Sequence, residues 1–138
     1  MKPLKWDGHT HSQFCYHGNP AELPLYLDRA VELGFERYTI SEHPPLPDRW
    51  VDNEALMAEL AMPMAQLPQY IAYAKEMKAR YADRLEVTIG LEMDYLHGNE
   101  AFSDRMLEQG ADDLEDVVVS VHYLPGSGGM RFIDFTAD

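Results

Sequence analysis

Five potential metal ligands follow the segments of this chain that we predict to be β-strands. His9 and His11 come after the first of these segments, His43 after the second, Glu92 after the third and His122 after the fourth. In a parallel sheet built from strand–helix repeats, the carboxyl ends of the strands open on one face, so side chains at successive strand ends can surround one site. The spacing therefore predicts a metal centre of the kind that metal-dependent hydrolases use.

Each of these residues also has an ordinary structural interpretation. His9 and His11 form a His-x-His pair with both rings on one side of a strand, but two exposed loop histidines would give the same pattern. His43 precedes two prolines, in a stiff turn that suits either a ligand or a structural histidine. Glu92 interrupts an apolar segment, where a carboxylate is costly unless it is paired, although it could be an exposed charge beyond the strand. His122 could be a core histidine. Their common placement favours a metal.

Three further residues are weaker candidates for a functional role. His17 lies in the loop after the first strand and is either another ligand or a polar loop residue. His97 precedes a glycine and an asparagine, so we assign it to a turn. Cys15 is the single cysteine, which excludes an intrachain disulfide, and we interpret it as a small buried residue because a cysteine nucleophile needs an activating base.

Strands and helices alternate along the sequence, and this alternation predicts an α/β fold with a parallel sheet. The fourth strand is a near-continuous run of apolar residues, which is typical of strands that are covered on both faces. Residues 125–130 are rich in glycine and predict a loop, and residues 131–135 could begin a fifth strand. The predicted strands are residues 4–8, 37–41, 85–91 and 116–121, and the predicted helices are residues 20–33 (capped by Asn19), 53–61, 67–81 and a short helix that ends near Gly110.

The composition narrows the possible partners. The 138 residues are enough for one domain, and the 24 acidic residues against 11 basic ones give a formal charge of −13. This charge disfavours electrostatic binding to nucleic acid or to an anionic membrane. No apolar run is long enough for a membrane span, and the amino terminus does not resemble a signal peptide, so we expect a soluble cytoplasmic protein.

Four short motifs, taken together in this order, resemble a known family. They are Asp7-Gly8-His9-Thr10-His11, Ser41-Glu42-His43-Pro44, Gly90-Leu91-Glu92-Met93-Asp94-Tyr95 and Ser120-Val121-His122-Tyr123. The pattern is similar to that of the polymerase-and-histidinol-phosphatase (PHP) superfamily, in particular its histidinol-phosphatase branch. The resemblance covers nearly the whole chain.

The resemblance implies a fold, a cofactor and an activity. The fold would be a distorted TIM-like (β/α)7 barrel, and the cofactor would be two to three divalent ions of zinc, iron or manganese. The activity would be hydrolysis of a small phosphorylated substrate, L-histidinol phosphate, to L-histidinol and phosphate in histidine biosynthesis. Glu92 would bridge two ions, and Glu42 and Asp94 would contact the substrate. The implied ligands are His9, His11, His17, His43, Glu92 and His122.

Family members continue through further strands that carry a D-x-H motif and phosphate-binding basic residues, and this sequence does not contain them. Residues 1–138 therefore correspond to the N-terminal portion of a PHP domain, with four to five parallel strands of an incomplete barrel. We expect the open edges to favour self-association. The alternatives are a metal-binding fragment without catalytic activity and a PHP phosphoesterase with another phosphorylated substrate.

Overall fold

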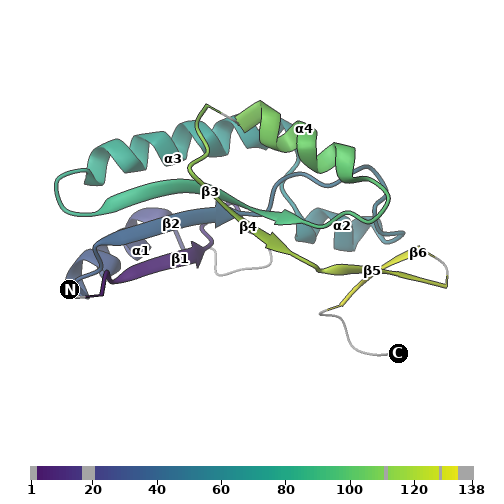
Figure 1. Ribbon diagram of the computed structural model, residues 1–138, viewed down its shortest axis with the longest axis horizontal. Helices are drawn as coiled ribbons and strands as arrows, with labels where there is room; N and C mark the ends of the chain where they lie inside the picture. The colour runs from purple at the N-terminus through teal and green to yellow at the C-terminus, as the bar shows by residue number, and fades with distance from the viewer. Residues whose placement is uncertain (1–2, 17–20, 111, 128, 134–138) are drawn as a thin grey trace.

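The structure is a computed structural model, and it describes residues 3–16, 21–110, 112–127 and 129–133. Four strands form one parallel sheet in the order in which they occur along the chain: β1 (Trp6–Thr10), β2 (Arg37–Glu42), β3 (Glu86–Asp94) and β4 (Asp116–Ser120). The helices are α1 (Leu23–Glu32), α2 (Glu54–Leu60), a 3-10 turn (Met64–Gln66), α3 (Leu67–Tyr81) and α4 (Glu100–Gly110). Figure 1 shows the resulting curled sheet, with α3 and α4 on one side. The predicted α/β fold, a part of a TIM-like barrel, is confirmed.

Helix α3 was predicted with its correct bounds, because its apolar residues recur at helical spacing. These residues are all buried, and they pack into the main core with the residues of β2 and β3 that face the helix. They are Leu67, Ile71, Ala74, Met77 and Tyr81. On β3 the alternation is clear, since Val87, Ile89, Leu91 and Met93 all join this core. The residues between them on β3 therefore face the concave side of the sheet.

Helix α1 begins later than we predicted. Its N-cap is Glu22, whose side chain makes no capping hydrogen bond, and Pro24 lies in the first turn. The predicted cap, Asn19, lies outside the described residues. The predicted end is confirmed: Gly34 has a φ of 72° directly after the last turn, a left-handed conformation that glycine adopts without steric cost.

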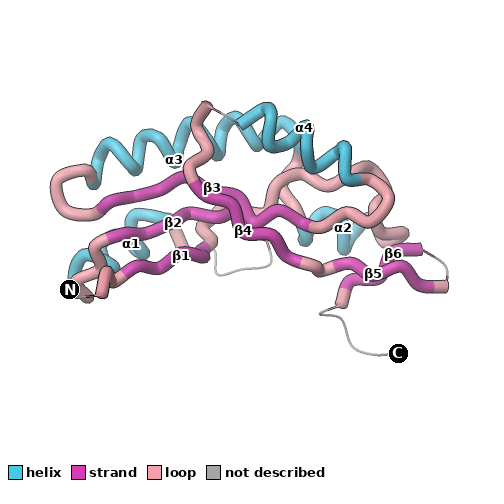
Figure 2. The backbone as a smooth tube through the Cα atoms, in the orientation of Figure 1, coloured by secondary structure: helices cyan, strands magenta, loops and turns pink. Residues whose placement is uncertain are grey.

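Two predictions about the C-terminal region were wrong. Strand β4 is covered on one face only: Val117, Val119 and Val121, on or just beyond it, are 40%, 69% and 48% exposed. It is an edge strand of the sheet, as β1 is, and none of the described helices packs over these valines as α1 and α3 pack over β2 and β3. Residues 125–130 do not form a loop but belong to an antiparallel hairpin, β5 (Tyr123–Gly126) and β6 (Gly129–Phe132), so the possible fifth strand is not parallel. Figure 2 shows this hairpin beyond the end of β4.

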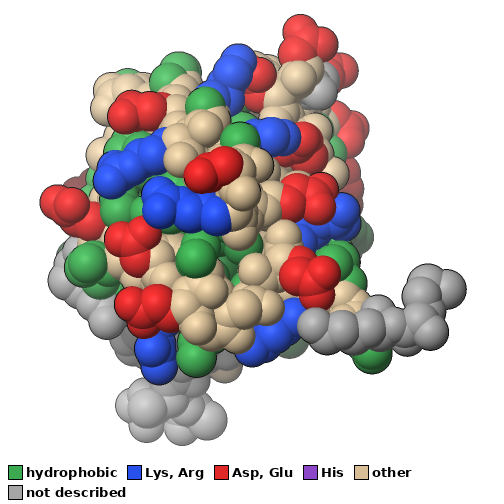
Figure 3. All heavy atoms as spheres, turned by 90° about the vertical axis from the view of Figure 1, so that its left-hand side faces the viewer, with side chains coloured by type: hydrophobic (Ala, Val, Ile, Leu, Met, Phe, Trp, Pro, Cys, Tyr) green, Lys and Arg blue, Asp and Glu red, His purple; other side chains and the backbone are tan. Residues whose placement is uncertain are grey.

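The two ends of the sheet carry different kinds of side chain. At the amino-terminal end of the strands, which faces the viewer in Figure 3, basic and acidic side chains are intermixed, as in the ion pair between Arg37 and Glu86 at 2.8 Å. The histidines of interest lie at the other end. A second, smaller core of Val51, Leu60, Leu96 and Tyr123 packs the α2 region against the hairpin at that end.

Candidate metal centre

The carboxyl ends of four adjacent strands bring the predicted ligands together. His9 lies within β1 and His11 directly beyond it, His43 follows β2, Glu92 lies within β3, and His122 follows β4. A register shift in the β1–β2 pairing, between Asp7 and Thr10, accompanies the approach of both β1 histidines to β3. His17 lies outside the described residues.

Glu92 is the centre of this arrangement. Its side chain is buried, and its Oε2 atom lies 2.8 Å from His9 Nε2, 3.1 Å from His11 Nε2 and 3.4 Å from His43 Nε2. On the other side, Glu92 Oε1 lies 3.5 Å from His122 Nε2. Four imidazoles from three other strand ends therefore surround one carboxylate. Because Glu92 has two oxygens with different neighbours, it has the geometry that a bridging ligand needs.

These separations suit a shared cation. Two ligands at about 2.1 Å from a tetrahedral zinc ion lie about 3.4 Å apart, and the nitrogen–oxygen distances around Glu92 are close to this spacing. The described residues contain three groups of at least three potential ligand atoms that lie within 4.8 Å of one another. The groups are His9, His11 and Glu92; His11, Cys15 and His43; and His43, Asp94 and His122. Imidazole-rich groups with a carboxylate suit zinc, iron or manganese, so the donor set fits the predicted metals.

Hydroxyl and carboxylate groups hold the potential ligands in place. Ser120 Oγ donates a hydrogen bond of 2.6 Å to Glu92 Oε1, and His122 Nδ1 lies 2.7 Å from Asp94 Oδ1. When one imidazole nitrogen contacts a carboxylate, the ring orientation and the tautomer are fixed, and the other nitrogen is presented to a metal. Ser120 is the last residue of β4 and begins the fourth of the motifs quoted above, but sequence reasoning did not assign it a role in the site.

Glu42 is enclosed by other groups of the protein. Its side chain is fully buried, and its Oε1 atom accepts hydrogen bonds of 2.6 Å from both the backbone N–H and the hydroxyl of Ser12. Its Oε2 atom lies 3.4 Å from His11 Nδ1. These contacts favour a role in orienting His11, and the predicted contact of Glu42 with substrate remains a prediction. Asp94 is also buried, and its predicted contact with substrate remains a prediction.

The charges of the site favour a cation. Burial alone would lower the pKa of His11, but hydrogen bonds to Glu42 and Glu92 outweigh it and raise the pKa to about 9. Burial opposes ionisation of Glu92, but hydrogen bonds from His11, Ser120 and His9 hold its pKa well below the usual range. Burial raises the pKa of Asp94 to about 6, although His122 partly offsets this effect. The buried carboxylates thus stabilise positive charge at this place, whether from protons or from metal ions.

The PHP domain profile matches residues 7–137. This range contains the whole four-stranded sheet apart from Trp6, the first residue of β1. The chain belongs to the PHP domain family. Among curated PHP relatives, the histidinol-phosphatase of Bacillus subtilis is 35% identical over 131 residues, which are 95% of this chain and 48% of that protein. The chain thus spans about half the length of the relatives that it matches.

Two solved structures share this fold. The crystal structure of a protein from Listeria monocytogenes, provisionally named a histidinol phosphatase, superimposes with a TM-score of 0.90 at 38% identity and covers 96% of this chain and 50% of that one. The histidinol phosphate phosphatase of Lactococcus lactis, complexed with zinc, L-histidinol and phosphate, has a TM-score of 0.58 at 23% identity and covers 88% of this chain and 41% of that one. None of the helices described here is long and apolar enough to cross a membrane.

Proposed function

We propose that this chain carries the metal centre of a phosphomonoester hydrolase that converts L-histidinol phosphate and water to L-histidinol and phosphate. The observation that carries the proposal is the convergence of four imidazoles on the buried carboxylate of Glu92. The names of the Bacillus and Listeria relatives support the substrate, as do the zinc, L-histidinol and phosphate of the Lactococcus structure. We place the protein in the cytoplasm, as a biosynthetic enzyme that does not act on nucleic acid.

The roles of the residues follow from their contacts. His9, His11, His43 and His122 would hold two to three divalent ions, with Glu92 as the bridge, and His17 is proposed as a further ligand. The bound ions would lower the pKa of the attacking water and neutralise the phosphate oxygens. Hydrolysis then breaks the bond between phosphorus and the ester oxygen, water supplies the new oxygen, and L-histidinol leaves with a proton.

The positioning residues act on the ligands. Ser120 holds one oxygen of Glu92, so its carboxylate plane is fixed before any ion binds. Asp94 and Glu42 contact the Nδ1 atoms of His122 and His11, which directs both Nε2 atoms towards Glu92. This support is what keeps a metal site rigid enough to stabilise a transition state.

Metal analysis and phosphate release test the proposal together. Purified protein should contain zinc, iron or manganese, and the double variant His9→Ala/His11→Ala should lose it, because two donors next to Glu92 disappear. His97→Ala is the matched control, since His97 is exposed and lies in none of the three donor groups. Equal metal content in the double variant and the wild type would refute the site.

Substrate comparison then separates the candidate activities. L-Histidinol phosphate, a generic aryl phosphate and single-stranded DNA are offered to metal-loaded protein, and we expect phosphate release from the first to exceed the others. Because the matched relatives are about twice as long, we expect slow turnover by the 138-residue chain. A protein that binds metal and hydrolyses none of the three substrates would favour the alternative of a metal-binding portion without activity of its own.

A further inference from the structure

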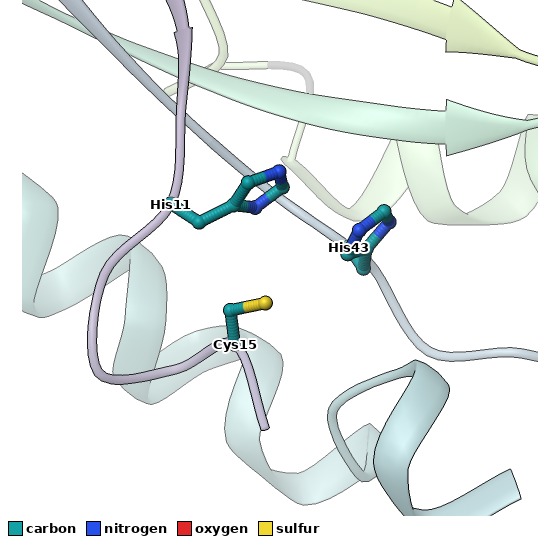
Figure 4. Close-up of side chains that lie close together, drawn as sticks. All are labelled: His11, Cys15 and His43. Carbon is teal, nitrogen blue, oxygen red and sulfur yellow. The ribbon is translucent and has the colours of Figure 1, made fainter. Parts of the chain in front are cut away.

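The side chain of Cys15 lies beside two histidines of the candidate metal centre. Its Sγ atom and one ring nitrogen each of His11 and His43 lie within 4.8 Å of one another. Figure 4 shows the Cys15 side chain extending from the loop after β1 towards these two rings. Cys15 and His43 are only 6% and 8% exposed, so two of the three donors are buried, while His11 is partly buried.

The loop that carries Cys15 is anchored by the residues that precede Cys15. The backbone N–H of Cys15 donates to the carbonyl of Ser12 at 3.0 Å, and Ser12 is held in turn by the buried carboxylate of Glu42. Between them, the ring of Phe14 packs on Tyr70 of α3, with centroids 5.7 Å apart. These contacts fix the direction of the Cys15 side chain.

The two imidazoles beside the sulfur are also fixed relative to each other. The rings of His11 and His43 stack with centroids 4.7 Å apart and an interplanar angle of 15°. A buried cysteine usually packs as a small apolar side chain among other apolar groups. Here its sulfur adjoins two nitrogen donors instead, and this setting is the one in which a thiol serves as a ligand.

We propose that Cys15 is a thiolate ligand of the metal centre and shares a divalent ion with His11 and His43. This inference rests on the proposed function, since it adds a donor to the same centre. A tetrahedral zinc ion, with Zn–S of about 2.3 Å and Zn–N of about 2.1 Å, separates such donors by about 3.6 Å, so a movement of about 1 Å by side-chain rotation completes the geometry. The S–H bond breaks as the S–metal bond forms, and the proton passes to solvent.

A thiolate changes which metal the centre prefers. Sulfur is a softer donor than imidazole or carboxylate, and it favours zinc over manganese. The three donor groups would then differ: the one with Cys15 suits zinc, whereas the one with Asp94 and His122 accepts harder ions as well. Loss of the sulfur should therefore reduce zinc binding more than manganese binding.

Cobalt substitution tests the proposal directly. The protein is depleted of metal, loaded with Co²⁺ and examined by absorption spectroscopy, in which a thiolate ligand gives an intense near-ultraviolet charge-transfer band and imidazole and carboxylate ligands give only weak visible bands. We expect the wild-type protein to show the intense band, and Cys15→Ser and Cys15→Ala to lose it while they keep the weak ones. His122→Ala is the matched control: it removes a ligand from another donor group and should retain the charge-transfer band.

The outcomes separate this inference from the proposed function. Visible bands without a charge-transfer band in the wild type would overturn the role of Cys15 and leave the histidine–glutamate centre standing. No bound cobalt at all would overturn both. If the Cys15 variants fail to fold by circular dichroism, the wild-type spectrum still decides, because Cys15 is the single cysteine of the chain and the sole source of a thiolate.

Discussion

Replacing Glu92 with glutamine should weaken metal binding more than any other single isosteric change in the site. Glutamine keeps the shape of the side chain but removes the negative charge that four imidazoles surround within 3.5 Å. Two unit charges 4 Å apart interact by about 4 kcal/mol at an effective dielectric constant of about 20, and a bound cation would lie closer than that to the carboxylate. Since about 1.4 kcal/mol corresponds to a tenfold change in affinity, we expect a loss of about 1000-fold.

Asp94→Asn is the matched comparison. Asp94 is also a buried carboxylate on β3, but among the described imidazoles its hydrogen-bond contact is with His122, at 2.7 Å. Loss of a group that orients a ligand costs about 10- to 100-fold in metal affinity, so the effect of this variant should be smaller.

Competition between the protein and a chromophoric zinc chelator at pH 7 gives the affinity of each variant. Circular dichroism of the metal-depleted proteins shows whether the fold is retained, which separates a loss of charge from a loss of structure. The reasoning fails if Asp94→Asn releases the metal while Glu92→Gln retains it, because the bridging role would then belong to Asp94.

Three further predictions concern stability and assembly. Gly90→Ala should lower the free energy of unfolding, measured by urea titration, by about 1–3 kcal/mol, because the added Cβ would lie 2.9 Å from the carbonyl oxygen of Asp116. Gly8→Ala is the control and should have a smaller effect, because the nearest atom to its added Cβ would be 3.4 Å away. We expect the chain to self-associate and so to cover the exposed valines of β4. Val119→Lys should weaken this self-association by about 10- to 100-fold in light scattering, which corresponds to the loss of one buried valine, whereas Leu25→Lys on α1, which is similarly exposed, should not. Removal of metal by a chelator should lower the melting temperature. If the free metal concentration before removal is 100 times Kd, the free energy of unfolding should fall by about 2.7 kcal/mol. An unchanged melting temperature would indicate that metal binds the folded and unfolded chains equally.

The positions of the four parallel strands could be predicted from the sequence because the signal for them is local, although β1 and β3 end two and three residues later than predicted and Glu92 therefore lies within β3. Val87, Ile89, Leu91 and Met93 alternate with smaller or polar residues, and this pattern alone puts Glu92 on the face opposite the helices. Once the strands are parallel and adjacent, their carboxyl ends must meet, and the convergence of the ligands follows from topology.

The burial of the side chains of β4 could not be predicted in the same way. A run of valines indicates a strand, but whether each valine is buried depends on what lies over it, and that partner is distant in sequence. Val119 is 69% exposed although it follows two other valines, Val117 and Val118. The hairpin was missed for a related reason, because the glycines of residues 125–130 are as typical of a tight hairpin turn as of a loop.

The groups that hold the ligands were missed because they lie far away in sequence. Ser12 and Glu42 are 30 residues apart, and Ser120 and Glu92 are 28 apart, so no local pattern reports either hydrogen bond. Cys15 was interpreted correctly as buried, but its position beside His43 depends on the path of a loop. Such contacts become predictable only after the register of the sheet is known.

Metal binding and the sheet depend on each other in this arrangement. The proposed ligands come from the ends of all four parallel strands, so an ion held by them would connect β1, β2, β3 and β4 at their carboxyl ends. The ion would also offset part of the formal charge of −13, in the place where buried carboxylates repel one another most strongly. Because the proposed ligands are placed by four different strands, the affinity for metal depends on the register of the whole sheet. A substitution such as Gly90→Ala, which touches no proposed ligand, should therefore weaken metal binding as well as folding.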